Sequence, residues 1–342
     1  MDKPAASFVA VMSSCVFYIF MSTITVIANK YISAGMSAEV KADIPQLAVI
    51  FYQCLIALVM VEGARVAGFT DYPPFRVEKA KTWIFVNILF IGMLSSNFMS
   101  FVYCSVPLVA IFKNLTNLAT VLGDWYFFGE SVTPLTLASI AVIILSALLS
   151  GINDLEFSMQ GYLWMLANCL FTAAYALYMR YLSVHIKLPK MGMVYYNNLL
   201  SVLILFPICL FTGDFAGIMK PEVLTPQFMI ATAIAGVCGC CLNFASLWCI
   251  SLTSATTYAI AGSMNKIPVA VLGFLLFEVH MTWNGVCYLC LATAGGFLFA
   301  YAKLVQSQDK ARMVTKSLDS PPETKATNHK PQTTADRPLS IL

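Results

Sequence analysis

Ten long apolar stretches make up most of this chain, separated by short polar segments that contain proline, glycine or charged residues. A helix needs ~20 mostly apolar residues to cross the hydrocarbon core of a bilayer, and each stretch is close to that length. The pattern therefore predicts an all-α integral membrane protein with ten transmembrane helices. The predicted helices cover residues 8–32, 45–67, 82–104, 107–128, 134–152, 161–182, 193–211, 227–249, 255–277 and 282–304.

The two ends of the chain are predicted to lie in the cytosol. With ten helices both ends fall on one side, and that side holds most of the lysines and arginines, whereas the other side holds only Lys41 and Lys220. Cytosolic loops carry the excess of basic residues in membrane proteins. We therefore expect a cytosolic N-terminus over residues 1–7 and a cytosolic tail over residues 305–342, which is rich in Ser, Thr, Pro and Lys and is predicted to be disordered.

The overall composition excludes a soluble globular domain. Of the 342 residues, 59% are hydrophobic and 11% are charged, and the mean hydropathy is +0.77. Soluble domains have about 45–50% apolar and about 25% charged residues. The eleven cysteines fall almost entirely within the apolar stretches, which indicates small packing residues rather than disulfides or metal ligands. We expect no metal and no other cofactor.

Two lysines, Lys113 and Lys266, interrupt apolar stretches at mid-membrane depth. A charged side chain at the centre of a membrane helix costs roughly 2.5–3.5 kcal/mol on insertion scales, so its presence indicates a functional site. The alternative for Lys113 is a structural ion pair, with Asp124 in the same stretch or with a carboxylate elsewhere, and Lys266 could likewise be structural. A cationic pocket inside lipid favours an anionic solute that crosses the membrane.

The two halves of the chain show a weak internal repeat. The triplet Val121-Leu-Gly123 recurs as Val271-Leu-Gly273, an offset of 271 − 121 = 150 residues. Under this offset Lys113 falls three positions short of Lys266, nearly one helical turn, so the two lysines would occupy similar faces of related helices. Five helices per half require the halves to be inverted, and inverted-repeat transporters bind their substrate near the midplane between the repeats. The predicted repeats are residues 8–152 and 161–304.

Other polar residues follow helical spacing and are expected to face one shared cavity. In one stretch Lys113, Asn117, Thr120 and Asp124 form a single stripe at i, i+4, i+7 and i+11. The alternative for any single Asn, Ser or Thr is a hydrogen bond to a neighbouring helix with no further role. The candidate substrate-binding residues from spacing are Tyr18, Lys113, Asn117, Asn197, Asn198, Asn243, Tyr258, Gly262, Asn265 and Lys266.

The chemistry of these candidates suits a nucleotide with a sugar attached. A lysine ammonium binds phosphate as a point charge, and two lysines offset the two charges of a nucleoside diphosphate linkage. The adjacent carboxamides of Asn197 and Asn198 present both donors and acceptors, which match the N1–H, N2–H and O6 groups of guanine. Tyr18 and Tyr258 can bond sugar hydroxyls, and Gly262 lets a ligand approach the backbone.

Several of these motifs resemble those of the Golgi GDP-mannose transporters, within the drug/metabolite transporter superfamily. Gly262-Ser-Met-Asn-Lys266 resembles the family's GALNK motif, and Tyr195-Tyr-Asn-Asn198 resembles its FYNN motif. Phe112-Lys-Asn-Leu-Thr-Asn117 and Thr256-Thr-Tyr258 also match stretches of the family. The resemblance covers roughly residues 8–305 and implies a ten-helix inverted-repeat antiporter that brings GDP-sugar into the Golgi lumen in exchange for GMP.

The resemblance also implies roles for individual residues. In the family the FYNN asparagines bind guanine, a role that carries over to Asn197 and Asn198. The GALNK segment contacts phosphate, ribose and sugar, and these roles carry over to Gly262, Ser263, Asn265 and Lys266. Ser263 and Met264 depart from the family's Ala and Leu, and we hypothesise that the added hydroxyl extends transport to GDP-fucose or GDP-arabinose.

Three other functions remain open on the sequence alone. The chain could carry UDP-sugars or another phosphorylated metabolite, it could be an integral-membrane enzyme, or it could be a channel. No paired catalytic carboxylates or His–nucleophile arrangement supports an enzyme, and no ring of like charges supports a channel. The expected partners are GDP-sugars, GMP and membrane lipid, with no nucleic acid. Small residues at 292–296 suit either a homodimer or packing within the chain.

Overall fold

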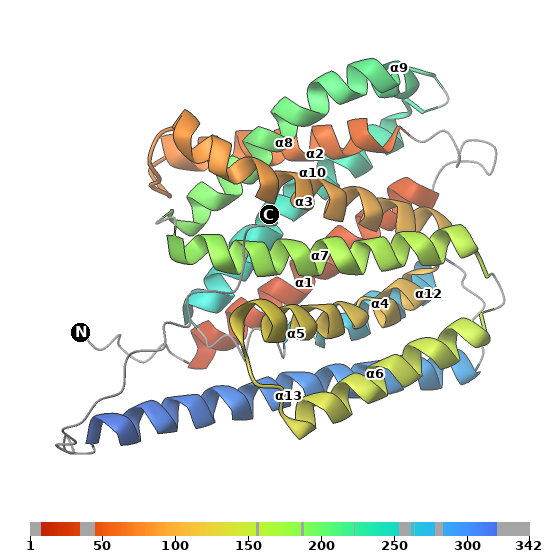
Figure 1. Ribbon diagram of the computed structural model, residues 1–342. Helices are drawn as coiled ribbons and strands as arrows, with labels where there is room; N and C mark the ends of the chain where they lie inside the picture. Colours follow the sequence, from red (N-terminus) through yellow and green to blue (C-terminus); the bar gives the residue numbers. More distant parts are fainter. Residues whose placement is uncertain are drawn as a thin grey trace. The chain divides into compact units, whose positions relative to one another are not determined.

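The computed structural model describes residues 8–34, 45–154, 157–185, 188–221, 223–252, 261–262, 264–277 and 283–319 (Figure 1). Over these residues the protein is helical, with no strand. The helices are α1 (Phe8–Ala34), α2 (Gln46–Val66), α3 (Val77–Tyr103), α4 (Val106–Phe112), α5 (Leu115–Phe128), α6 (Pro134–Ile152), α7 (Met159–His185), α8 (Lys190–Thr212), α9 (Asp214–Ile218), α10 (Pro226–Leu252), α12 (Lys266–Leu276) and α13 (Trp283–Asp319).

Nine stretches of described helix, counting α4 and α5 together as one, are long and apolar enough to cross a membrane. These nine confirm the prediction of an all-helical membrane protein. The remaining predicted helix, residues 255–277 and the ninth in chain order, begins on residues outside the described part of the chain. Its described part is residues 261–262 and 264–277, which include α12, an apolar helix too short to span a bilayer alone.

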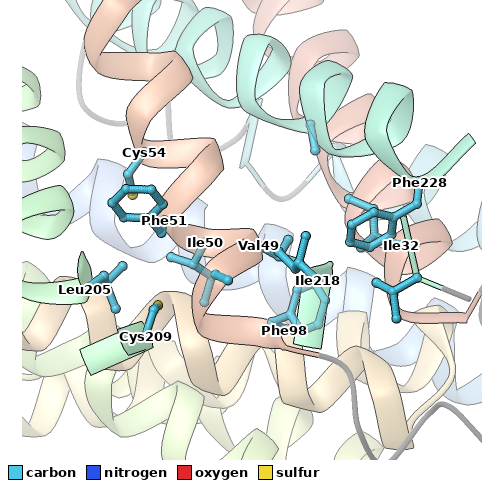
Figure 2. Close-up of a cluster of buried hydrophobic side chains, with 13 residues drawn as sticks. Ile32, Val49, Ile50, Phe51, Cys54, Phe98, Leu205, Cys209, Ile218 and Phe228 are labelled. Atoms are coloured by element: carbon cyan, nitrogen blue, oxygen red, sulfur yellow. The ribbon is translucent and has the colours of Figure 1, made fainter. Parts of the chain in front are cut away.

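Helices distant in sequence pack side by side within the unit Met1–Leu304. α1 lies along α10, α3 lies along α7, and α2 contacts both α8 and α10. Figure 2 shows one buried cluster at which these helices meet, with Phe51 from α2, Phe98 from α3 and Leu205 from α8. Large apolar side chains such as Phe211 and Leu170 are instead exposed. Exposed leucine and phenylalanine on a helix face are what contact with lipid requires.

The predicted helix over residues 107–128 is in fact two helices. α4 ends at Phe112 and α5 begins at Leu115, with Lys113 and Asn114 between them. Here the Asn114 amide donates to Ile111 O at 3.1 Å, a tight i→i−3 bond, and the regular i→i−4 ladder is interrupted. A second break occurs at Asn265, which is a turn residue immediately before α12. Lys113 and Lys266 therefore both lie at interruptions of a helix.

The last helix is longer than predicted. α13 continues to Asp319, so residues 305–319 are helical where the sequence predicts a disordered tail. The segment contains Lys, Arg, Gln, Ala and Met and no proline or glycine, and such residues readily extend a helix that has already formed. Residues 305–342 form a unit separate from Met1–Leu304. Residues 1–7 and 320–342 lie outside the described part of the chain.

The small residues of α13 pack against another helix of the same chain. Gly295 lies so close to α6 that a Cβ atom there would be 2.8 Å from Ile143 Cγ1. Ala292 is almost fully buried, in a cluster that includes Ala147 of α6. These contacts supply the close helix approach for which small residues are enriched in membranes. A homodimer through this helix stays a prediction.

Candidate functional site

A cavity of about 110 Å³ lies where α1, α3 and α4 meet the α12 segment, by which we mean Gly262, Asn265 and the first turn of α12. Six apolar residues form most of its wall, together with Ser22, Gly262 and Asn265. Lys113 and Lys266 complete it. The lining residues are Ser22, Val26, Phe101, Val106, Val109, Ala110, Lys113, Gly262, Asn265, Lys266 and Val269. Four predicted site residues thus share one cavity, although about 150 positions of the chain separate Lys113 from Gly262, Asn265 and Lys266.

The size and charge of this cavity indicate what part of a ligand it accepts. Ligand pockets for drug-sized molecules have volumes of about 300–1,000 Å³, so the cavity fits a phosphate-sized group and not a whole nucleotide sugar. Among its described lining residues there are two lysines and no carboxylate. The start of α12 also faces this region, and a helix N-terminus carries partial positive charge. The cavity is suited to an anionic group.

The ammonium group of Lys113 has no hydrogen-bond acceptor among the residues that the structure describes. Lys113 is the C-cap residue of α4, and among the described residues its Nζ makes no hydrogen bond. Its Nζ lies over the ring of Phe101, whose centroid is 5.6 Å away. Asp124, the alternative ion-pair partner, instead lies with its Oδ2 3.8 Å from Lys303 Nζ on α13. Lys113 is therefore available to a ligand.

Lys266 is hydrogen-bonded to a residue that is not among the predicted site residues. As the first residue of α12, it donates from Nζ to Oδ1 of Asn114. Asn114 is 1% exposed, and its Nδ2 donates to Ala292 O at 3.3 Å. The prediction omitted Asn114 because a continuous helix would place it off the polar stripe. Its position beside Lys113, between two apolar runs, was the available signal.

Asn265 ties the α12 segment to α1. Its Nδ2 donates to Ser22 Oγ at 2.6 Å, and its Oδ1 accepts from Thr23 Oγ1 at 3.0 Å. On the same side, a Cβ at Gly262 would lie 3.7 Å from the hydroxyl of Tyr18. The structure therefore brings Tyr18 next to the predicted glycine at the edge of the cavity. It also shows that the Asn265 carboxamide is engaged by the protein itself.

Asn197 and Asn198 belong to a different polar cluster, on α8. Asn197 is buried, its Oδ1 accepts from Trp83 Nε1 at 2.7 Å, and its Nδ2 donates to Tyr175 Oη at 2.8 Å. Asn198 Nδ2 donates to Val194 O at 2.8 Å, whereas its Oδ1 accepts no hydrogen bond from the described residues. Neither residue lines the lysine cavity. Sequence spacing had grouped these residues with the lysines.

The remaining predicted residues lie elsewhere. Asn117 on α5 and Asn243 on α10 are half-buried and do not line the cavity. Tyr258 and Ser263 lie outside the described residues. Within the described part of the chain, no group of three or more His, Cys, Asp or Glu could hold a metal ion.

Comparison with known proteins places the chain in a family. The family described as "Triose-phosphate Transporter family" matches residues 9–300, nearly all of the membrane helices. The chain belongs to the triose-phosphate transporter family. A member of this family is a transporter and not an enzyme, which confirms the expectation drawn from the missing catalytic arrangements.

Relatives of this family member carry a more specific name. A "GDP-mannose transporter" of Arabidopsis thaliana is 30% identical over 295 residues, which cover 84% of this chain and 87% of the relative. The "GDP-mannose transporter" of Sclerotinia sclerotiorum is 29% identical over 333 residues, 90% of this chain and 82% of the relative. One crystal structure of another protein matches with a TM-score of 0.55 and 13% identity, covering 92% of this chain and 100% of that one. At that identity the match supports the fold alone.

Proposed function

We propose that this transporter carries GDP-mannose and related GDP-sugars into the Golgi lumen in exchange for GMP. The observation that carries the proposal is the cavity in which Lys113 and Lys266 meet without a carboxylate among the described lining residues. Two uncompensated ammonium groups match the two negative charges of a nucleoside diphosphate sugar. The relatives named GDP-mannose transporters, which cover most of the chain, supply the identity of base and sugar.

In the proposed complex the diphosphate lies on the two lysines and the guanine on the asparagine pair of α8. Asn198 already offers an oxygen without a partner among the described residues, which suits the N1–H and N2–H donors of guanine. Asn197 would have to exchange its bonds to Trp83 and Tyr175 for bonds to the base. Because the cavity fits only a phosphate-sized group, binding also requires the helices around it to open. The same proposal gives Tyr18, Asn117, Asn243, Tyr258, Gly262, Ser263 and Asn265 to ribose and sugar contacts.

Transport would proceed by alternating access, with both chain ends in the cytosol. GDP-mannose binds from the cytosol and leaves to the lumen, and GMP returns through the same site. Helix interruptions at Lys113 and Asn265 are typical of transporters that bind an ion or substrate between repeats. The hydroxyl of Ser263 is the proposed reason for uptake of GDP-fucose or GDP-arabinose as well.

A second candidate is a carrier of smaller phosphorylated metabolites, or of UDP-sugars. The family's name and the small volume of the cavity favour this alternative. A triose phosphate needs one anion site and no base-binding residues, whereas a UDP-sugar needs a different order of donors and acceptors at the base. Competition between substrates separates these candidates.

The deciding experiment uses purified protein in liposomes preloaded with GMP. Labelled GDP-mannose should enter faster than into empty liposomes, and external GMP should compete much better than UMP or a triose phosphate. Equal competition by UMP, or stimulation only by preloaded triose phosphate, would contradict the proposal. Labelled GDP-fucose and GDP-arabinose in the same assay test the wider sugar range, and failure of either to compete at large excess refutes that part alone.

A further inference from the structure

The partner of Lys266 is chemically unusual for an ammonium group at a mostly apolar cavity. Buried lysines are commonly paired with a carboxylate, which neutralises them. Lys266 donates instead to the neutral carboxamide of Asn114, a side chain that is 1% exposed. Asn114 is the N-cap residue of α5 and follows Lys113 directly. One residue therefore connects the two lysines from opposite halves of the chain.

The orientation of this carboxamide is determined by its second hydrogen bond. Asn114 Nδ2 donates to Ala292 O on α13 at 3.3 Å, and so Oδ1 is left to accept from Lys266. Turning the amide over would bring its NH₂ group against the ammonium and its oxygen against a carbonyl, and both contacts would be repulsive. The backbone of α13 thereby keeps an acceptor aimed at Lys266.

A neutral acceptor orients the ammonium without cancelling its charge. A carboxylate at the same place would form an ion pair with Lys266 and lower the positive potential of the cavity, whose described lining contains no acidic residue. Lys113, which has no acceptor among the described residues, would then be the one uncompensated cation. The choice of amide over carboxylate at position 114 leaves two positive charges for the ligand instead of one.

We propose that Asn114 is a positioning residue that sets the charge specificity of the site. By holding Lys266 in place and leaving it charged, it makes the site select ligands with two negative charges. This inference rests on the proposed function, because it needs a ligand that competes for the two lysines. It assigns Asn114 no contact with the ligand.

The test compares an isosteric acidic variant with a neutral one in self-exchange of labelled GMP. The competitors are GMP, a dianion near pH 7.5 because its second phosphate pKa is about 6, and guanosine 5′-methylphosphate, a monoanion with the same base. Wild type should bind GMP more tightly than the methyl ester. Asn114→Asp should reduce that preference by about tenfold or more. Asn114→Ala should weaken both competitors to a similar degree and keep the preference, because the cavity keeps its charge.

The outcomes separate this inference from the proposed function. If wild-type protein fails to exchange GMP or GDP-mannose, the proposed function is wrong. If wild type exchanges and Asn114→Asp keeps the wild-type preference, or Asn114→Ala loses it as fully, only the role of Asn114 is overturned. Should Asn114→Asp not be recovered as folded protein, Asn114→Glu against Asn114→Gln makes the same comparison of a charged with a neutral side chain.

Discussion

At the scale of single residues, the three buried or cavity-lining lysines differ in what they donate to. Lys30 is 9% exposed and donates to Phe101 O and, at 2.8 Å, to Cys104 O at the end of α3. Lys266 donates to a carboxamide, and Lys113 has no acceptor among the described residues. An ammonium buried without partners costs stability and persists where function uses it. The partners of each lysine therefore predict different effects on stability and transport.

Replacing Lys113 should damage transport and spare the fold. Lys113→Gln loses no hydrogen bond to the described residues and removes the cost of a charge, so the melting temperature in detergent should stay equal or rise. Uptake of GDP-mannose should fall about tenfold or more, because half of the positive charge of the cavity is gone. A melting temperature lowered as much as in the Lys30 variant below would show that Lys113 is structural.

The matched control is Lys30→Met, which keeps a long unbranched side chain and removes the ammonium group. Two carbonyl groups at the end of α3 then lose a charged donor, and each such hydrogen bond contributes about 1.5–3 kcal/mol. Lys30→Met should therefore lower the melting temperature. Uptake per folded molecule should change far less than in the Lys113 variant.

Lys266→Ala should both reduce transport, as expected for the Lys113 variant, and lower stability, as expected for the Lys30 variant. Transport should be abolished, because the lysine of the GALNK-like segment is removed. The Asn114 oxygen is left buried without a donor, which costs about 1–3 kcal/mol, so the protein should melt earlier and still reach its membrane as folded protein. Uptake assays and size-exclusion profiles measure the two parts, and transport at a near-wild-type rate would undo the assignment of Lys266.

At the scale of elements, hydropathy predicted the helices and missed their interruptions. Apolar runs of ~20 residues identify a membrane helix because the bilayer core has a fixed thickness. The break at Lys113–Asn114 contains no proline or glycine, so no helix-breaking residue marks it. The missed break also affected the predicted site. A continuous helix over residues 107–128 would place Asn114 off the polar stripe that contains Lys113, and Asn114 was therefore not predicted to be a site residue.

Long-range partners explain the rest of what the sequence could not predict. The segment Tyr195–Asn198 is recognisable, but the bonds of Asn197 to Trp83 and Tyr175 join α8 to α3 and α7 across more than 20 positions. Helical spacing assigns residues to one face of a helix and cannot tell which of several neighbours that face meets. That the two lysines belong to a site was predictable, because a charged residue inside an apolar stretch stands out in the sequence without knowledge of its spatial neighbours.

The close approach of α4 and α12 leads to a prediction at this scale (Figure 1). A Cβ at Gly273 would lie 2.6 Å from Val106 Cβ, an atom that cannot rotate away. Gly273→Ala should therefore separate the two helices that carry the lysines, with a loss of about 1–3 kcal/mol in stability and a lower uptake rate. Thermal melting and uptake of GDP-mannose measure both.

Gly63→Ala on α2 is the control for this substitution. No atom lies within 4 Å of a Cβ at that position, so alanine adds no clash. Alanine favours the helix over glycine by about 0.5–1 kcal/mol. The Gly63 variant should be as stable as wild type or more stable, and should transport normally. A Gly273 variant that behaves in the same way would mean that α4 and α12 are not closely packed in the membrane.

At the scale of the whole molecule, the charge of the cavity leads us to expect that exchange is favoured over free passage. An empty site with two ammonium groups would carry that charge whenever the protein changed its open side, and moving charge through the membrane is costly. A bound dianion cancels it. Reorientation should therefore be fast when the site is occupied and slow when it is empty, which couples the entry of one anion to the exit of another.

This coupling predicts how exchange responds to membrane potential and pH. At pH 7.5 GDP-mannose and GMP both carry two negative charges, so one-for-one exchange moves no net charge, and a potassium–valinomycin potential should leave the uptake rate unchanged. At pH 5.5 GMP is mostly a monoanion, because its second phosphate pKa is about 6. Each cycle then brings one net negative charge inward, and a potential negative inside should slow uptake. Guanosine 5′-methylphosphate as the internal anion should produce that slowing at pH 7.5 as well, and potential-dependent uptake at pH 7.5 with internal GMP would show that the exchange is not dianion for dianion.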